Sequence, residues 1–372
     1  MIRTVRAHLN VAAQSHAGMT GKNNEDRYAV TSYQVDEDDP TPVLFAVVAD
    51  GIGGHRAGEV AAELAVDHIS QVIEESDARR PQKILTRAIH EASEAIADHA
   101  SSTPDKKGMG ATCACVLVIG DKLYTASVGD SRIYLLRGGR IQQLTTDHTW
   151  IQEAIDKNII TPEQAHDHPN VHVIRRYLGS PEPPEVDFRL RLYDSEADAL
   201  AESNQGLQLS PGDILLICSD GLTDLVWNDE IAEIIRSKNN VKAAAQALIE
   251  TANKRGGHDN TTVVLMLAPK NLELTAAKRK SKWPWIIGGI LALLLLITFA
   301  SVLAINLLRT TLLATPTPTA TATSTPTALQ TETMTNTPAP TETAAPATSS
   351  PIGPTYTPWP THTFTVEDTP TP

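Results

Sequence analysis

Acidic residues at the ends of predicted strands are the part of this sequence whose type and spacing could do chemistry. Two apolar runs, "VVADGIGGH" and "ILLICSDGLTD", each stop on an Asp followed by Gly. Similar positions are held by five aspartates and one glutamate: Asp26, Asp50, Asp130, Asp220, Asp259 and Glu25. If the strand ends converge, so many carboxylates repel one another strongly without cations. Hard divalent ions with oxygen ligands, Mg²⁺ or Mn²⁺, are the expected partners.

The glycines beside these aspartates allow two interpretations. Gly lets the backbone turn sharply and approach closely, so that a carbonyl can join the coordination of an ion. Asp-Gly after a strand is also an ordinary turn signal, and one instance alone predicts only a turn.

The elements that must position these carboxylates alternate in blocks. Helices are predicted over residues 58–75 and 81–100, and again over 228–238 and 241–256. A polar segment, Thr145 to Pro184, is expected to hold two short helices and loops. Strands are predicted over 5–15, 42–50, 111–120, 122–129, 131–139, 140–144, 213–220 and 260–267. Runs of strands alternating with paired helices favour an α+β layered sandwich over a doubly wound sheet.

After this domain the sequence contains first an uncharged apolar stretch and then a Thr- and Pro-rich segment. Residues 285–308 contain no charged side chain and are long enough to cross a hydrocarbon core of about 30 Å, which predicts one transmembrane helix. Four basic residues precede the span and only Arg309 follows it closely, so residues 1–268 are expected in the cytoplasm. The Thr- and Pro-rich residues 309–372 are expected to form a disordered tail outside the membrane. Residues 269–284 would be a basic juxtamembrane linker.

The composition of the chain limits the classes of partner and metal site that it could have. A net charge of −13 argues against nucleic acid as the main partner and suits a site built from carboxylates. Cys113, Cys115 and Cys218 lie in apolar, strand-like stretches, and their spacing does not match a metal cluster. They are interpreted as small core residues. The tail is interpreted as a spacer, with an adhesive or sensory use as the alternative.

The order of the motifs resembles the metal-dependent protein phosphatase 2C-like (PPM) family in its bacterial, membrane-anchored form. The resemblance runs from about Ala7 to Leu267. Its seven markers occur in the family's order: "NNED" (23–26), "ADGIGGH" (49–55), "GMGAT" (108–112), "SVGDSR" (127–132), "LTTDHT" (144–149), "SDGLTD" (219–224) and "GGHDNTT" (256–262).

The resemblance implies a four-layer αββα sandwich with a cleft that holds two Mn²⁺ or Mg²⁺ ions, or three. Asp50 would bridge two ions, the Gly51 carbonyl would bind one, and Asp220 and Asp259 would complete the set, so these aspartates are the predicted catalytic residues. Asp26 is also a predicted metal ligand, and Glu25 would act through bound water. Asp130 with Asp220 would hold a weaker third ion. Asn260 would orient Asp259 or serve as an ordinary turn residue.

Two positions depart from the family's pattern. Gly21 stands where many members carry an Arg that binds the substrate phosphate, and Arg27 is the first choice to replace it, with Lys22, Arg175 and Arg176 as alternatives. Ile52 stands where eukaryotic relatives carry a His, which indicates bacterial lineage.

Histidines in the segment that resembles a mobile flap, His148, His166, His168 and His172, either contact substrate or are solvated, and His55 and His258 are interpreted as loop residues.

The predicted function is a protein serine/threonine phosphatase that hydrolyses phosphoserine and phosphothreonine with a metal-activated water and without a covalent phospho-enzyme. Its partners would be phosphorylated proteins, namely Ser/Thr kinases and their substrates at the same membrane. The alternative, motivated by Gly21, is a catalytically weak phosphoprotein-binding or signalling scaffold at the membrane. A nucleotide-binding interpretation of "DGIGGH" fails because the sequence lacks the Lys-Ser/Thr of a P-loop there.

Overall fold

The computed structural model describes residues 1–53, 57–102, 104–165, 168–270 and 283–312. These residues fall into two units, of which the first contains residues 1–270 as described and the second contains a single helix. Each unit is considered by itself below.

Two antiparallel sheets form the middle of the first unit. One sheet has the strand order β1-β3-β4-β7-β8-β11 and the other has the order β10-β9-β12-β13-β2. Tight turns join β7 to β8 and β9 to β10, as predicted from "IGDK" and "RGGR", and Gly120, Gly138 and Gly139 supply the positive φ angles. A short pair, β5 with β6, lies apart from both sheets. The strands are β1 Ile2–Arg3, β2 Asn10–His16, β3 Arg27–Gln34, β4 Pro42–Ala49, β5 Gly51–Ile52, β6 Gly110–Ala111, β7 Cys113–Ile119, β8 Lys122–Val128, β9 Arg132–Arg137, β10 Arg140–Gln143, β11 Leu207–Gln208, β12 Ile214–Cys218 and β13 Thr261–Leu267.

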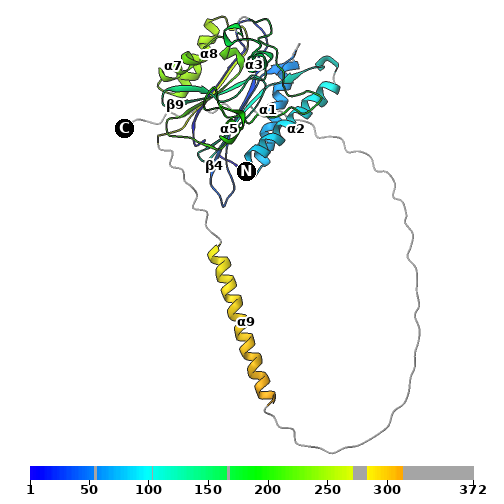
Figure 1. Cartoon of the computed structure of the whole chain (residues 1–372), viewed down its shortest axis with the longest axis vertical. Coiled ribbons are helices and arrows are strands. Elements are labelled where there is room, and N and C mark those ends of the chain that lie inside the picture. The colour runs from blue at the N-terminus through cyan, green and yellow to red at the C-terminus, as the bar shows by residue number, and fades with distance from the viewer. Residues whose placement is uncertain (54–56, 103, 166–167, 271–282, 313–372) are drawn as a thin grey trace, which may run out of the picture. The chain divides into compact units, whose positions relative to one another are not determined.

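Helices cover the outer faces of the two sheets. Figure 1 shows α1 and α2 on one side of the strands and α7 and α8 on the other. The helices of this unit are α1 Ala57–Glu75, α2 Pro81–Ser102, the 3-10 turn η1 Pro104–Lys106, α3 Trp150–Asp156, α4 Pro162–Ala165, α5 Asp198–Ser203, α6 Asp220–Thr223, α7 Asn228–Arg236 and α8 Val241–Lys254.

The alternation of side chains along β4 explains the layering. Val43, Phe45 and Val47 pack with α1 and α2, whereas Leu44 and Val48 face the second sheet. Successive residues of a strand point to opposite faces, so a strand with continuous apolar sequence is buried on both sides. A third core lies between the second sheet and the pair α7 and α8. Three cores between four layers confirm the α+β sandwich.

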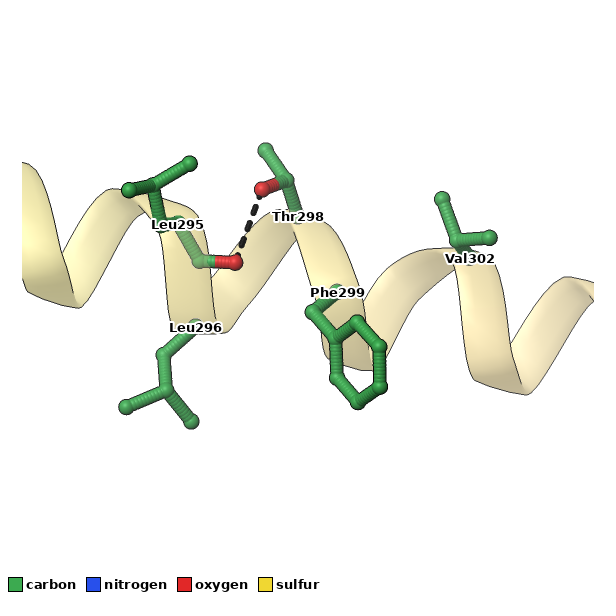
Figure 2. Close-up of a pocket in the computed structure, with 5 residues that line it drawn as sticks. All are labelled: Leu295, Leu296, Thr298, Phe299 and Val302. Atoms are coloured by element: carbon green, nitrogen blue, oxygen red, sulfur yellow. Dashed lines mark hydrogen bonds between the residues drawn. The ribbon is translucent and has the colours of Figure 1, made fainter.

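The second unit is the helix α9, Trp283–Leu312. Its described side chains include exposed apolar residues, and Figure 2 shows Leu295, Leu296, Thr298, Phe299 and Val302 projecting from the helix. Thr298 Oγ1 donates to the carbonyl of Leu295 at 2.9 Å, so this hydroxyl finds its partner within the helix (Figure 2). Within the described part of the chain, no helix meets both the length and the hydropathy of a membrane span. The predicted span therefore stays a prediction.

The predicted elements agree closely with the observed ones, with a few exceptions. The local sequence carries no strand signal at β1, β5, β6 or β11 and no helix signal at α5, and Asp220 begins the short helix α6 directly after β12. Most of the predicted linker and nearly all of the predicted tail lie outside the described residues, in 271–282 and 313–372.

Candidate metal centre

Strand pairing in the first sheet brings Asp26 and Asp50 to the same edge. Arg27 of β3 lies opposite Ala49 of β4 in the antiparallel register. Asp26 directly precedes the first residue of that pair and Asp50 directly follows the second. Two carboxylates far apart in the sequence therefore leave the sheet side by side.

The second sheet supplies two more carboxylates through its two central strands. Cys218 of β12 pairs with Val263 of β13, so the end of β12 and the beginning of β13 meet. Asp220 follows the end of β12, and Asp259 precedes β13. The carboxylates of the two sheets interact electrostatically, because Asp26, Asp130, Asp220 and Asp259 all act on the pKa of Asp50.

Asp130 lies in the turn between β8 and β9. Gly129 adopts φ +105°, and a Cβ there would lie 2.6 Å from the Thr112 side chain, so the turn requires glycine. Thr112 Oγ1 lies 2.7 Å from Ser131 Oγ, and it accepts the backbone N–H of Asp50 at 3.0 Å. The Thr112 hydroxyl thus connects the loop of Asp50 to the turn of Asp130.

The electrostatics of the cluster favour protonated carboxyls when no cation is bound. Burial, together with a smaller effect of neighbouring carboxylates, raises the pKa of Asp26 to about 6 and that of Asp130 to about 7. Burial, followed by the charges of nearby aspartates, also raises the pKa of Asp50 and Asp220 well above the ordinary value. Asp259 is exposed at the rim of the cluster. A positive charge is therefore what this site lacks.

Three carboxylate oxygens in the cluster provide a test of whether the site fits cations. Asp26 Oδ1, Asp130 Oδ1 and Asp220 Oδ1 are buried and make no hydrogen bond. Native structures rarely leave buried oxygens without a partner, and the binding of an ion at such a place is one of the usual reasons. A donor set made of carboxylates and carbonyls matches the preference of Mg²⁺ and Mn²⁺. The residues present fit divalent cations.

Asp26 is held in place from the opposite sheet. Ser219 Oγ donates to Asp26 Oδ2 at 2.7 Å, and the same Ser219 oxygen accepts the backbone N–H of Thr262 at 2.9 Å. This arrangement fixes one oxygen of Asp26 and leaves Oδ1 for a ligand. Both Ser219 and Thr262 are fully buried.

The position of Gly51 depends on a close backbone crossing. Gly51 in β5 passes over Gly58 in the first turn of α1, and a Cβ on Gly58 would lie 2.6 Å from the Gly51 carbonyl oxygen. Glycine at both positions allows this approach. Ile52, the next residue, pairs with Gly110 of β6.

The side chain of Asn260 neither orients Asp259 nor merely forms a turn, which were the two predicted roles. Its side-chain oxygen accepts the Glu25 backbone N–H at 2.6 Å, and its amide donates to the carbonyls of Ala17 at 3.1 Å and Asn23 at 3.0 Å. The backbone N–H of Asn260, and not its side chain, donates to Asp259 Oδ1 at 2.8 Å. Asn260 therefore fastens the loop that carries Glu25 and Asp26 to the start of β13.

Arg27 is already engaged in the structure. Its guanidinium donates to Glu59 Oε1 at 2.6 Å and to the carbonyls of Asn24 at 2.9 Å and Asp26 at 2.8 Å. Through these bonds Arg27 connects the loop that carries Asp26 to α1. The predicted contact of Arg27 with the substrate phosphate stays a prediction. Gly21 adopts φ +75°, a conformation that an Arg side chain rarely adopts, with nothing within 4 Å of a Cβ placed there.

The histidines of the flap differ from one another. His172 Nδ1 lies 3.6 Å from Asp224 Oδ2, and ligand atoms of His172, Asp220 and Asp224 all lie within 4.8 Å of one another. His168 stacks on Trp150 with ring centroids 4.7 Å apart. Neither predicted role suits His148, which is buried and hydrogen-bonded to other protein groups. His258 is exposed, whereas His55 and His166 lie outside the described residues.

A polar hollow of about 350 Å³ lies beside the start of the flap. Arg175 and Arg176, two of the alternative phosphate ligands, line it together with His148, Arg189 and acidic residues. Arg176 pairs with Glu185 at 3.0 Å and Arg175 with Glu153 at 3.7 Å.

Sequence reasoning missed several residues that support the cluster. Asp224 lies four residues after Asp220 in a helical turn, a spacing that places both on one face and could have indicated its role. Thr112 and Ser219 lay inside motifs but were not assigned. The salt bridge of Arg132 with Asp147, at 2.6 Å, lies close enough to Asp130 to act on its pKa. Nothing in the local sequence predicted it.

Known proteins resemble this chain over most of its length. Residues 16–154 match the family model described as protein phosphatase 2C. The serine/threonine phosphatase stp of Listeria monocytogenes is 35% identical over 262 residues, which cover 69% of this chain and 95% of that protein. The serine/threonine protein phosphatase PstP of Mycobacterium tuberculosis is 35% identical over 257 residues, covering 69% of this chain but 44% of PstP, so the match spans less than half of that relative.

A solved structure supports the same relation. The crystal structure of the catalytic domain of PstP in complex with two manganese ions has a TM-score of 0.57 and 34% sequence identity, covering 70% of this chain and 97% of that one. With its two sheets, its outer helices and its carboxylates at one end of the sandwich, this chain belongs to the protein phosphatase 2C family.

Proposed function

We propose that this chain is a metal-dependent protein serine/threonine phosphatase that uses two Mn²⁺ or Mg²⁺ ions, with a third at a weaker site. The observation that carries the proposal is the group of carboxylates at one end of the sandwich, with three buried oxygens that make no hydrogen bond. The relatives named above, which are serine/threonine phosphatases, support the choice of substrate.

Residues from both sheets would bind the cations. Asp50 and the Gly51 carbonyl would hold the central ions, and Asp220 and Asp259 would complete their coordination from the second sheet. Asp26 joins through the oxygen that Ser219 leaves unpaired. Glu25 would contribute through bound water. These assignments follow the strand ends that meet at the site.

Asp130, together with Asp220, would hold the third ion. Asp130 Oδ1 is buried without a partner, and Asp220 is the residue that the two sites would share. Asp224 and His172 lie close to Asp220, with ligand atoms of all three residues within 4.8 Å of one another.

Bound cations supply a nucleophilic water of lowered pKa and stabilise charge on the phosphoryl group. The protein's part is to keep the carboxylates in place and ionised. Because burial raises the pKa of Asp26 and Asp130, cation binding must displace protons from the cluster, and it becomes more favourable as the pH rises toward 7.

The activity can be tested on the full chain, purified in detergent, with a phosphothreonine peptide in Mn²⁺, in Mg²⁺ and in EDTA. We expect phosphate release that needs a divalent ion and that Asp220→Asn abolishes. Asp229→Asn, which changes an exposed acidic residue of α7, is the matched control and should retain full activity. A folded chain that binds Mn²⁺ but releases no phosphate would favour the phosphoprotein-binding alternative.

We also propose that α9 anchors the chain in a membrane, with residues 1–268 in the cytoplasm and the segment 309–372 outside. The uncharged stretch 285–308 supports this proposal, as do the basic residues that precede it. The hydroxyls of Thr298 and Ser301 donate to backbone carbonyls within α9, which lowers the cost of placing them in lipid.

Membrane attachment can be tested by carbonate extraction and protease protection in cells. The full chain should stay in the membrane pellet, and a tag at residue 372 should be digested from outside while a tag at residue 1 is protected. Phe299→Lys combined with Leu296→Lys should release the chain, because each charge at mid-span costs about 3 kcal/mol. A wild-type chain in the soluble fraction would refute the proposal.

A further inference from the structure

Hydrogen bonds form a closed ring that begins at the backbone of Asp26 and ends at its carboxylate. The Asp26 backbone N–H donates to Asn24 Oδ1 at 3.1 Å, and Asn24 Nδ2 donates to Ser15 Oγ at 2.7 Å. Ser15 Oγ lies 2.7 Å from Thr262 Oγ1. The Thr262 backbone N–H then donates to Ser219 Oγ at 2.9 Å, and Ser219 Oγ donates to Asp26 Oδ2 at 2.7 Å. These residues are called the Asp26 ring below.

The chemistry of the donors sets the direction of the ring. A backbone N–H can only donate, so the Asn24 atom that faces the Asp26 backbone is the amide oxygen, and the amide nitrogen faces Ser15. For the same reason Ser219 Oγ accepts from Thr262, which leaves its single proton for the Asp26 carboxylate. The bond between the Ser15 and Thr262 hydroxyls can run in either direction, and both directions close the ring.

The pairing of β2 with β13 brings the two middle members of the ring together. Thr262 of β13 is the register partner of Ser15 of β2. Side chains alternate along a strand, so Thr262 lies on the same face as Val264, which packs in the core between the two sheets. The Ser15 and Thr262 hydroxyls therefore meet at the end of this core. Ser15 lies outside the family motifs, so no motif indicates a role for it.

Burial makes the ring stiff. Asp26, Ser219 and Thr262 are at most 2% exposed, so a member that lost its partner would have no water to replace it. A fully paired network in such surroundings holds its groups in one arrangement. Asp26 Oδ2 is engaged by Ser219, whereas Asp26 Oδ1 is buried and makes no hydrogen bond. The ring thus leaves one oxygen of Asp26 in a fixed position for a cation.

We propose that Ser15 is a positioning residue that holds the cation ligand Asp26 in place through the Asp26 ring. This inference rests on the proposed function for the role of Asp26 as a ligand. Without the Ser15 hydroxyl, the Asn24 amide and the Thr262 hydroxyl both lose a partner. The Asp26 backbone is then no longer held on that side, Oδ1 leaves its fixed position part of the time, and the affinity for the cation falls.

Two substitutions at Ser15 and one control test this role. Ser15→Ala removes the hydroxyl and is compatible with the strand, since β2 already contains two alanines. Ser15→Thr keeps the hydroxyl and suits a strand. The matched control is Ser32→Ala. Ser32 is a buried serine near the far end of β3 from Asp26, and its Oγ accepts from Thr4 Oγ1 at 3.1 Å and donates to the Thr4 carbonyl at 2.9 Å.

The first measurement is hydrogen exchange of the metal-free full chain, which does not depend on catalysis. In Ser15→Ala we expect the Asp26 amide to exchange about tenfold faster, as for one lost hydrogen bond, because Asn24 is no longer held toward it. Ser15→Thr and Ser32→Ala should leave this amide near the wild-type rate. An unchanged rate for the Asp26 amide in Ser15→Ala would overturn the proposal.

The second measurement is Mn²⁺ binding by calorimetry, which separates positioning from a merely structural role. Ser15→Ala should weaken one class of Mn²⁺ sites by roughly tenfold or more, because substitution of a residue that orients a ligand typically costs about 10-fold to 100-fold in affinity. Ser15→Thr should restore the wild-type affinity, and Ser32→Ala should not change it. Wild-type affinity in Ser15→Ala would show that the Asp26 ring only stabilises the fold, and the proposal would be wrong.

A double substitution shows whether Ser15 acts through Asp26. In the Asp26→Ala background, the further change Ser15→Ala should have no effect on the remaining Mn²⁺ sites, because the effects of residues that act through one group do not add. If Ser15→Ala weakens these sites as much as it weakens those of the wild type, Ser15 acts elsewhere and the proposal fails. A chain that meets all these expectations but releases no phosphate from the phosphothreonine peptide would refute only the proposed function.

Discussion

Replacing Asp130 with Asn should stabilise the chain when no metal is bound. The pKa of Asp130 is raised from 3.8 to about 7, chiefly by burial and then by Asp147. The folded chain therefore binds more protons than the unfolded chain between these pH values. The contribution of this carboxyl to the free energy of unfolding therefore falls as the pH rises from 4 to 7 and stays low above 7.

The size of the effect follows from the shift. About three pH units at 1.36 kcal/mol each give an upper limit of about 4 kcal/mol, and we expect Asp130→Asn to gain roughly 2 to 4 kcal/mol at pH 7.5. At pH 5.0 the carboxyl is already protonated in the folded state, so most of the gain should disappear. With saturating Mn²⁺ the order should reverse, because the wild type gains more from the ions it binds.

Urea denaturation followed by circular dichroism, in EDTA at pH 7.5 and at pH 5.0, measures these differences directly. Asp229→Asn, at an exposed position, should change stability by less than about 0.5 kcal/mol at either pH. The reasoning is wrong if Asp130→Asn destabilises the metal-free chain at pH 7.5, or if its gain is the same at both pH values.

Three other predictions concern the packing around the site and the domain. Burial lowers the pKa of His8 from 6.5 to about 4, so the contribution of His8 to the free energy of unfolding should fall by about 1.4 kcal/mol per pH unit as the pH drops from 6.5 to 4. Acid denaturation of His8→Gln should lack this slope, and an identical pH profile would contradict the assignment. Gly58→Ala should destabilise by about 1 to 3 kcal/mol although Ala favours helices, because its Cβ meets the Gly51 carbonyl; thermal melting and Mn²⁺ titration test this, and a raised melting temperature would count against it. Arg27→Ala should lower stability by about 1 to 3 kcal/mol through the lost bond to Glu59, and unchanged stability would contradict this structural role. A rise in KM for phosphopeptide in the same variant would confirm the predicted phosphate contact, and an unchanged KM would show that prediction to be wrong.

The sequence by itself determined the layers and most of the elements. Continuous apolar runs such as residues 43–49 are typical of strands buried on both faces, and the amphipathic stretches of α1, α2, α7 and α8 supply the outer layers. The predicted ligands could be placed because the five aspartates lie where strands begin or end, four of them next to Gly, Asn or Ser. Local patterns were sufficient for these predictions because strand and helix periodicities are themselves local.

Only the tertiary structure decided how the side chains between those elements pair. Asp26 and Ser219 are 193 residues apart, and Glu25 and Asn260 are 235 apart, so no local pattern indicates their bonds. The same reason explains Arg27, whose partner Glu59 lies on α1, and His148, whose bonds to Gly129 and Asp187 depend on the packing of three separate segments. Sequence spacing identifies the groups that can bind a cation. The fold decides which of them meet, because long-range hydrogen bonds form only where packed sheets bring distant loops to one edge.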